Sequence, residues 1–236
     1  KRDASWLITD FAEKPKDPAV LAHMVSRDDP ARPYLGSMGI YLFRTQVLID
    51  LLNTPGFDDF GKHVIPSAIG KLNVVGYDYD GYWEDIGTIR SFYETNLALT
   101  LPNPPFDLFD PDAPIYTHAR FLPGSIVQNS HLENVLLAEG CYIRSASIRH
   151  SIIGVRSQIN HGVTIKDSII MGADTFDQPF AHDPCEDCDS IPIGIGSNCY
   201  IEGAIIDKNA HIGHDVVIRP FPMDAKIDDQ PNWVIR

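Results

Sequence analysis

Aliphatic residues recur at about every fifth or sixth position between residues 126 and 218. The series is Ile126, Leu132, Leu137, Ile143, Ile148, Ile153, Ile159, Ile165, Ile170, Ile195, Ile201, Ile206, Ile212 and Ile218. Several members that lie three steps apart are separated by 17 residues, as in the pairs Ile126 and Ile143 or Ile148 and Ile165. This hexapeptide repeat predicts a parallel β-helix of about four triangular coils, in which each inward aliphatic side chain stacks on the one a coil below.

The residues between these anchors suit the corners of such coils. Segments 154–162 and 207–215 are rich in Gly, Asn, His, Ser and Asp, which tolerate tight turns and left-handed backbone. The segment 171–192 interrupts the repeat and is left out of the coils.

The first hundred residues show a different, mixed pattern. Alternating apolar positions predict strands at 5–15 and 35–43 and two paired strands in 71–87. Helical periodicity predicts helices at 45–53, 60–69 and 88–100, with Thr45 and Thr88 as N-caps, and a polar loop extends to residue 33. A proline-rich run follows, so we expect one domain at 1–101, a linker at 102–121 and a second domain at 122–236.

Composition narrows the class of protein. The chain has 236 residues, of which 44% are hydrophobic, and this is enough for one or two globular cores. A net charge of −13 argues against nucleic acid and anionic membranes as partners. Because no stretch of 18 apolar residues and no leader is visible, we expect a cytoplasmic protein, or a plastid one if its source is a plant.

Two short segments of the first domain are candidates for ligand binding. Glu13 and Lys14 place a carboxylate beside an ammonium at a predicted strand end, although exposed neighbouring charges are commonly only a solvated face. The small residues of 36-GSMG-39 would let a ligand approach the backbone, or would instead form a bulge or pack tightly against a neighbouring segment.

The segment 82-YWEDIGT-88 joins a predicted strand to a helix N-terminus. Asp85 would suit Mg²⁺, which binds one or two carboxylates together with phosphate oxygens, while the helix end offers donors to an anion. The alternative is that Asp85 only caps the helix.

The interruption contains Cys185 and Cys188 in a C-x-x-C pattern with His182 nearby. Zinc requires four ligands, and Cys141 and Cys199 lie in the repeat, where small buried side chains are expected. We favour a plain surface loop here, with metal binding and redox pairing as alternatives.

Taken in order, these stretches resemble the glucose-1-phosphate adenylyltransferases, also called ADP-glucose pyrophosphorylases. The resemblance rests on 11-FAEKPKDP-18, 36-GSMGIYLF-43, 59-DFGKHVIP-66, 80-DGYWEDIGTI-89, 110-DPDAPIYT-117, 152-IIGVRSQI-159, 170-IMGAD-174 and 204-AIIDKNAHIG-213. The last three segments look most like the cyanobacterial and plant branch. The implied fold is the C-terminal part of a Rossmann-like nucleotidyltransferase domain (α/β), followed by an all-β, left-handed parallel β-helix.

The resemblance implies transfer of AMP from ATP to glucose 1-phosphate, which gives ADP-glucose and pyrophosphate for glycogen or starch synthesis. Glu13, Lys14 and Ser37 fall on sugar-phosphate positions, and Trp83 falls on an aromatic residue of the sugar pocket. Asp85 falls on a position that binds Mg²⁺, and Asp85 and Lys14 are the expected catalytic residues.

The family is also tetrameric and allosteric, so the resemblance implies a homo- or heterotetramer. Sugar-phosphate or phosphoglycerate activators and inorganic phosphate would bind between the two domains. Arg156, Lys208 and Arg219 are the candidate effector residues, and the alternative for each is an outward, solvated corner residue.

One departure from the family is that no G-G-x-G-[ST]-R-L nucleotide loop and no first metal aspartate precede 13-EKP-15. We therefore expect a fragment of a longer enzyme that is inactive alone. Two alternatives stay open: a noncatalytic regulatory subunit of the same enzyme, and a hexapeptide acyltransferase. The acyltransferase would use one of four histidines in the repeat region, which are His150, His161, His211 and His214.

Overall fold

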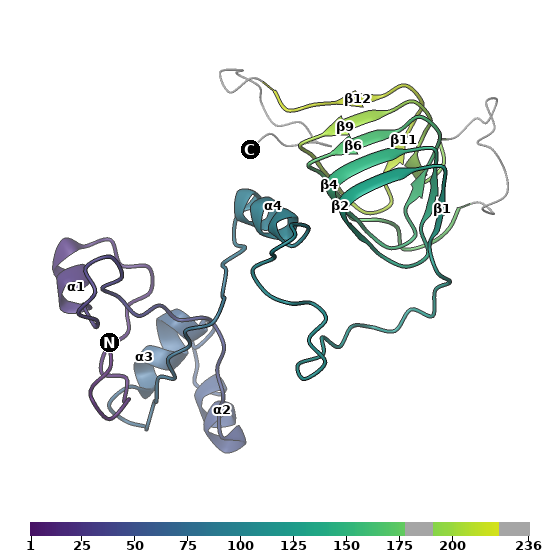
Figure 1. The fold of residues 1–236 in the computed structure, drawn as a ribbon. Helices are drawn as coiled ribbons and strands as arrows, with labels where there is room; N and C mark the ends of the chain where they lie inside the picture. Colours follow the sequence, from purple (N-terminus) through teal and green to yellow (C-terminus); the bar gives the residue numbers. More distant parts are fainter. Residues whose placement is uncertain (178–190, 222–236) are drawn as a thin grey trace. The chain divides into compact units, whose positions relative to one another are not determined.

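The computed structural model describes residues 1–177 and 191–221 (Figure 1). The chain forms two compact units, Lys1–Trp83 and Glu84–Arg236. Within the described ranges, no helix is both long enough and apolar enough to cross a membrane. The predicted C-x-x-C site, with Cys185, Cys188 and His182, lies outside these ranges.

The first unit contains short helices: α1 (Pro18–His23), α2 (Thr45–Leu52), the π-helix η1 (Phe60–Val64) and α3 (Ile65–Ala68), which follows η1 directly. α2 and the η1–α3 pair confirm the helices expected at 45–53 and 60–69. α1 was expected to be loop. It forms because the Asp17 side chain accepts the Ala19 N–H at 2.8 Å and Pro18 occupies the first helical position, where its fixed φ is favourable.

The cap predicted for α2 is wrong. Arg44, and not Thr45, is the N-cap residue, and it makes no side-chain cap hydrogen bond. Because Arg44 already has extended dihedrals, Thr45 is the first helical residue and its hydroxyl is not in the capping position.

The strands expected at 5–15, 35–43 and 71–87 do not form ladders in the described chain. This part of the molecule has isolated bridges at Arg2–Ile8, Leu7–Val75 and Ile69–Leu72. A strand is stabilised by hydrogen bonds to a neighbouring extended segment, and alternating apolar residues alone do not supply that neighbour. The alternation in these segments was therefore wrongly interpreted as strand.

The second unit contains the predicted parallel β-helix. One face consists of β1 (Ile126–Gln128), β3 (Tyr142–Arg144), β5 (Gln158–Ile159), β8 (Gly194–Ile195) and β11 (His211–Ile212). The remaining strands are β2 (His131–Leu137), β4 (Ser147–Ile153), β6 (Thr164–Lys166), β7 (Ile169–Ile170), β9 (Tyr200–Glu202), β10 (Ile205–Ile206) and β12 (Val217–Ile218). Five strands on one face make about five coils, one more than expected. Dividing the length of the repeat region by 17 gives the number of steps from one coil to the next, and this number is one smaller than the number of coils.

The strand register corrects one detail of the repeat. Val127, and not Ile126, pairs with Ile143, so the first coils advance by 16 residues. The later step of 17 is confirmed, for example between Ile148 and Ile165. Ile159 pairs with Ile195, so the stack of coils continues on the far side of the interruption.

The inward residues form one continuous aliphatic column. Fully buried members are Ile143, Ile148, Ile153, Ile159, Ile165 and Ile201. Cys141 and Cys199 are buried beside them as free thiols, as expected, and burial raises the pKa of both. The two segments predicted as corners carry residues with left-handed backbone, among them Gly162, Asn209 and Asp215 with φ of 72°, 58° and 58°. The corner chemistry predicted from the sequence is therefore confirmed.

Helix α4 (Ile89–Ala98) confirms the helix expected at 88–100 and its cap. The Thr88 hydroxyl accepts the Ser91 N–H at 3.0 Å, and the Ser91 hydroxyl in turn accepts the Thr88 N–H. α4 packs on β4 and β7 (Figure 1), so it belongs to the same compact unit as the β-helix.

Candidate functional site

The predicted sugar-phosphate residues of the first unit are held in defined positions. Lys14 has a left-handed backbone, with φ of 43°, and its ammonium lies 3.8 Å from a carboxylate oxygen of Glu13. The Lys14 side chain is 90% exposed, whereas that of Glu13 is 33% exposed. The Glu13 carboxylate lies close to Gly61, because a Cβ at position 61 would collide with Glu13 Oε2. The Lys14 ammonium is therefore exposed and could meet a phosphate, while the Glu13 carboxylate is more covered and lies beside Gly61.

Ser37 lies in a tight turn. Its hydroxyl accepts the Gly39 N–H at 3.2 Å and is 2.9 Å from the hydroxyl of Tyr41. Gly39 has φ of 72°, which favours glycine at this position. The Tyr41 ring stacks on Phe60, with ring centroids 5.8 Å apart and an angle of 11° between the planes.

The π-helix η1 connects these two segments. Phe60 stacks on Tyr41, the partner of Ser37, and the next residue, Gly61, lies against Glu13. Asp59 caps η1 by accepting the Lys62 N–H at 2.8 Å, and this hydrogen bond lowers the pKa of Asp59. A single short element thus contacts the surroundings of both Glu13 and Ser37, two of the predicted sugar-phosphate residues.

Tyr41, Phe60 and Gly61 are candidate site residues that we did not predict from the sequence. Their segments carried the family resemblance, but nothing in their spacing indicated contact with residues 13 and 37. The one available signal is Gly61 itself, because a glycine lets a neighbouring side chain approach the backbone closely.

Trp83 and Asp85 lie on either side of the boundary between the two compact units. The Trp83 side chain is exposed. In the second unit, Asp85 Oδ1 accepts the Gly87 N–H at 3.0 Å, which places Asp85 in a turn just before α4. Since Thr88 caps the helix, the alternative role of Asp85 as the helix cap is wrong.

Asp85 fits a role as a single metal ligand. Its Oδ1 accepts the Gly87 N–H, and a carboxylate has a second oxygen that can serve as a hard ligand. In the described ranges, no three or more His, Cys, Asp or Glu side chains gather in a group that would hold a metal ion. Mg²⁺ commonly binds one or two carboxylates and takes the rest of its ligands from phosphates and water. The residues present therefore suit a metal that arrives with its nucleotide.

Two of the three predicted effector residues lie near each other on the β-helix. Lys208 Nζ is 2.9 Å from Asp174 Oδ1, and this hydrogen bond is the main cause that lowers the pKa of Asp174. Arg156 donates to the carbonyl of Ala173, the neighbouring residue, at 3.1 Å. Both cations thus have acceptors on the same segment, at Ala173 and Asp174.

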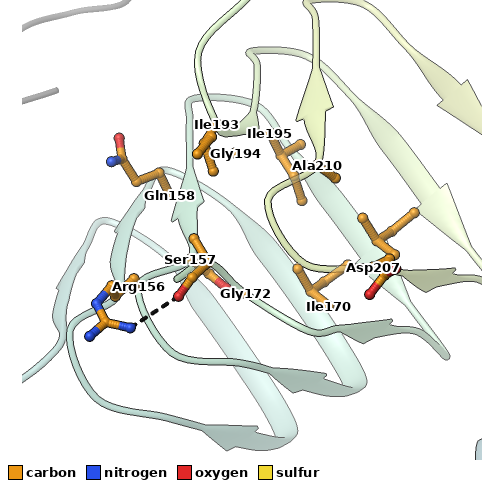
Figure 2. Close-up of a pocket in the computed structure, with 12 residues that line it drawn as sticks. Arg156, Ser157, Gln158, Ile170, Gly172, Ile193, Gly194, Ile195, Asp207 and Ala210 are labelled. Carbon is orange, nitrogen blue, oxygen red and sulfur yellow. Dashed lines mark hydrogen bonds between the residues drawn. The ribbon is translucent and has the colours of Figure 1, made fainter. Parts of the chain in front are cut away.

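Arg156 and Asp207 also line a small hollow, shown in Figure 2. Its volume is about 20 Å³, which suits a water molecule. A sugar phosphate is too large for it, so an effector would have to bind outside it. Arg219, the third predicted residue, lies instead over the Tyr200 ring, 4.4 Å from its centroid.

The histidines considered for an acyltransferase have structural contacts. His150 Nδ1 is 2.6 Å from Asp167 Oδ1, and His211 Nδ1 is 2.6 Å from the Ile191 carbonyl oxygen. His214 Nδ1 accepts the Ser197 N–H at 2.9 Å. These contacts hold one coil or loop to another, so the structure gives no support to a catalytic histidine among these three.

Two protein-family models match the chain. The nucleotidyl transferase model matches residues 1–101, and the GLGC left-handed parallel β-helix domain matches residues 120–236. The matches confirm the expected fold class, with a nucleotidyl transferase domain followed by a left-handed β-helix. The placement in the cyanobacterial and plant branch stays a prediction. The two matches, in this order, show that the chain belongs to the glucose-1-phosphate adenylyltransferase family, sugar nucleotidyltransferases of the ADP-glucose pyrophosphorylase type.

Proposed function

We propose that this protein serves the transfer of AMP from ATP to glucose 1-phosphate, which yields ADP-glucose and pyrophosphate for glycogen or starch synthesis. The observation that carries the proposal is the arrangement around η1. Gly61 of this element leaves the space that the Glu13 carboxylate occupies, and Phe60 stacks on Tyr41, the hydrogen-bond partner of Ser37, while the neighbouring Lys14 ammonium stays exposed.

Each of these groups suits part of a sugar phosphate. The Lys14 ammonium is a mobile point charge for the phosphate. The Glu13 carboxylate accepts hydrogen bonds from sugar hydroxyls, and the Ser37 hydroxyl both donates and accepts. Restraint of Glu13 and Ser37 lowers the entropy that is lost when the sugar binds.

The proposed reaction is a displacement at phosphorus. A phosphate oxygen of glucose 1-phosphate forms a bond to the α-phosphorus of ATP, and the bond from that phosphorus to pyrophosphate breaks. Lys14 stabilises the charge of the attacking phosphate and orients it for in-line attack. Asp85 would hold Mg²⁺, which neutralises phosphate charge and favours departure of pyrophosphate.

Regulation and assembly are further parts of the proposal. The β-helix would assemble the protein into a homo- or heterotetramer in the cytoplasm or a plastid. A sugar-phosphate or phosphoglycerate activator, or inorganic phosphate, would compete with Asp174 for Lys208, because anion binding there requires the Lys208–Asp174 contact to open. Arg156, which bonds the carbonyl next to Asp174, would supply a second cation.

The experiment is a Mg²⁺-dependent assay of pyrophosphate release by the full-length enzyme with ATP and glucose 1-phosphate. Lys14→Ala should raise KM for glucose 1-phosphate at least about tenfold, since a charged hydrogen bond to phosphate contributes about 1.5–3 kcal/mol. Lys16→Ala, which removes another exposed lysine two residues on, is the matched control. Equal effects of both variants would contradict the proposed role of Lys14.

The same assay separates the alternatives. An inactive full-length protein that still assembles into tetramers would indicate the noncatalytic regulatory subunit. Preference for UTP or dTTP would contradict the proposed nucleotide, and turnover of acyl-CoA would indicate the acyltransferase.

A further inference from the structure

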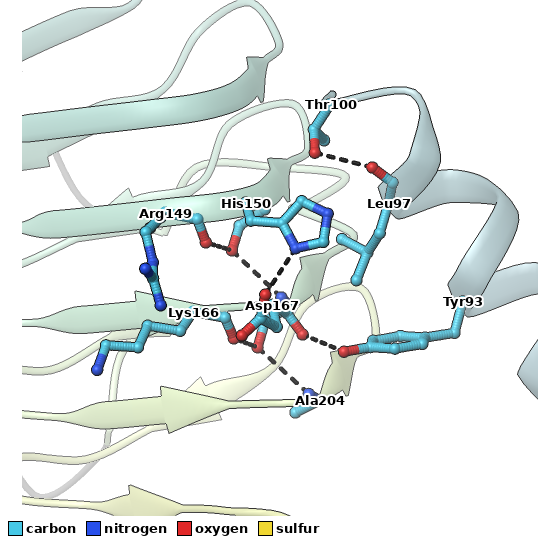
Figure 3. Close-up of polar contacts among 10 residues, drawn as sticks. Tyr93, Leu97, Thr100, Arg149, His150, Lys166, Asp167 and Ala204 are labelled. Carbon is cyan, nitrogen blue, oxygen red and sulfur yellow. Dashed lines mark hydrogen bonds and ion pairs between the residues drawn. The ribbon is translucent and has the colours of Figure 1, made fainter. Parts of the chain in front are cut away.

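Helix α4, which begins directly after the Asp85 turn, is attached to a corner of the β-helix (Figure 3). The Tyr93 hydroxyl donates a hydrogen bond to the main-chain carbonyl of Asp167, 74 residues further along the chain. One helical turn later, Leu97 is 5% exposed. The hydrogen bond of the Tyr93 hydroxyl is therefore a specific polar contact beside the buried, apolar side chain of Leu97.

The acceptor of this hydrogen bond is itself held in place. Asp167 Oδ1 is 2.6 Å from His150 Nδ1, and the Asp167 N–H donates to the Arg149 carbonyl at 3.2 Å. His150 and Asp167 occupy equivalent corner positions in successive coils, both with φ of 45°. The Asp167 carbonyl thus offers a fixed point to the helix.

An apolar stripe on the outer surface of the β-helix explains why the helix docks there. Leu136, Ile152, Ile169 and Ile205 are paired with one another across successive strands. They alternate with inward residues such as Ile153 and Ile170, so they point outward. Ile169 is nevertheless only 3% exposed, and α4 contacts its strand. Apolar contact holds the helix on this stripe, while the directional Tyr93 hydrogen bond fixes its position along the stripe and its rotation.

The other end of α4 connects closely to Asp85. The reciprocal Thr88–Ser91 capping box fixes the first turn, and Asp85 accepts the Gly87 N–H one residue before the cap. The segment from Asp85 to Tyr93 therefore has hydrogen bonds along its length, with no long free linker between them.

We infer that Tyr93 is a positioning residue for the Asp85 carboxylate: it sets the place of α4 on the β-helix, and α4 sets the place of the Asp85 turn. The inference rests on the proposed role of Asp85 as a Mg²⁺ ligand. It makes the β-helix a support for the metal carboxylate, so a change at the Asp167 corner alters Mg²⁺ use.

The test compares Tyr93→Phe with the full-length parent enzyme, because this change removes only the hydroxyl. The Mg²⁺ concentration for half-maximal activity should rise about three- to tenfold, the effect of one lost hydrogen bond, while KM for glucose 1-phosphate stays within about twofold. Amide hydrogen exchange in residues 85–98 should become faster. Tyr142→Phe is the control, since Tyr142 Oη bonds Gln128 on another face of the β-helix.

His150→Asn is the second variant, and it decides the question if Tyr93→Phe does not fold. Asparagine tolerates the left-handed corner backbone, and the change removes the imidazole that holds Asp167. It should shift the Mg²⁺ requirement in the same direction by a smaller factor.

Asp85→Asn separates this inference from the function on which it rests. If Asp85→Asn keeps normal Mg²⁺-dependent turnover, the metal role of Asp85 is wrong. If Asp85→Asn is inactive but Tyr93→Phe matches the parent in Mg²⁺ requirement and hydrogen exchange, the positioning role is wrong. A Tyr93→Phe enzyme that only melts earlier, with an unchanged Mg²⁺ requirement, also overturns it.

Discussion

The carboxylate of Glu13 lies directly against Gly61, in space that any side chain at position 61 would need. The preceding residue, Phe60, stacks on Tyr41, which is hydrogen-bonded to Ser37. The start of η1 is therefore the support of the proposed sugar-phosphate site. Substitutions in η1 should therefore change the affinity for glucose 1-phosphate, although the η1 residues are not proposed to contact this substrate.

Gly61→Ala should displace Glu13 and raise KM for glucose 1-phosphate about tenfold, because a bulk-induced misplacement removes one charged hydrogen bond to the sugar. Steady-state kinetics of the full-length enzyme measure this effect. Gly124→Ala is the control, since a Cβ there meets nothing within 4 Å. An unchanged KM in Gly61→Ala would show that Glu13 does not need this support.

Tyr41→Phe removes the hydroxyl next to Ser37 while it keeps the ring that stacks on Phe60. KM for glucose 1-phosphate should rise about two- to fivefold, as expected for one neutral hydrogen bond, and kcat should change less. Ser37→Ala measured in parallel sets the scale. If Ser37→Ala weakens binding and Tyr41→Phe does not, Tyr41 has no part in orienting Ser37.

The β-helix could be predicted from sequence because each coil pairs with the next one along the chain, so the repeat specifies both the strand and its partner. The sequence of the first unit has no repeat, so it does not indicate which segment would pair with which. Alternating residues such as Ile40 and Leu42 indicated a strand, but both are exposed and have no ladder in the described chain. Pairing between distant segments is not encoded in a local pattern.

The site was predictable only in part, for a similar reason. Glu13, Lys14, Ser37 and Asp85 were found through their motifs. The link from Tyr93 to Asp167 was not, because its acceptor is a main-chain carbonyl, which every residue carries and which leaves no sequence signal. The offset of 16 between Val127 and Ile143 was missed because Ile126, one residue away, fits the apolar pattern equally well.

The aliphatic column should dominate the stability of the β-helix. Ile165→Ala, at a fully buried position in the middle coils, should lower the free energy of unfolding by about 2–5 kcal/mol. Ile218→Ala, at a half-buried position in the last described strand, should cost clearly less. Urea unfolding followed by circular dichroism compares the two. Equal losses would contradict the buried column as the main source of stability.

Docking of α4 should weaken at alkaline pH. Burial raises the pKa of Tyr93, with smaller contributions from the charges of Asp167 and Glu202. A group whose pKa is higher in the folded protein stabilises it fully below the unfolded pKa, here about 10, and this contribution is lost as pH rises through the folded value. The advantage of the parent over Tyr93→Phe in melting temperature should therefore persist up to about pH 10 and shrink above it. A difference independent of pH would contradict this account.

The most direct test of the central claim is pyrophosphate release by the full-length enzyme from ATP and glucose 1-phosphate, with Mg²⁺, beside its Asp85→Ala variant. The account predicts that the parent forms ADP-glucose and that the variant loses at least about 100-fold in kcat, as expected when a metal ligand at a phosphoryl-type transfer is removed. A parent that uses another nucleotide in place of ATP, or a variant as active as the parent, would contradict it.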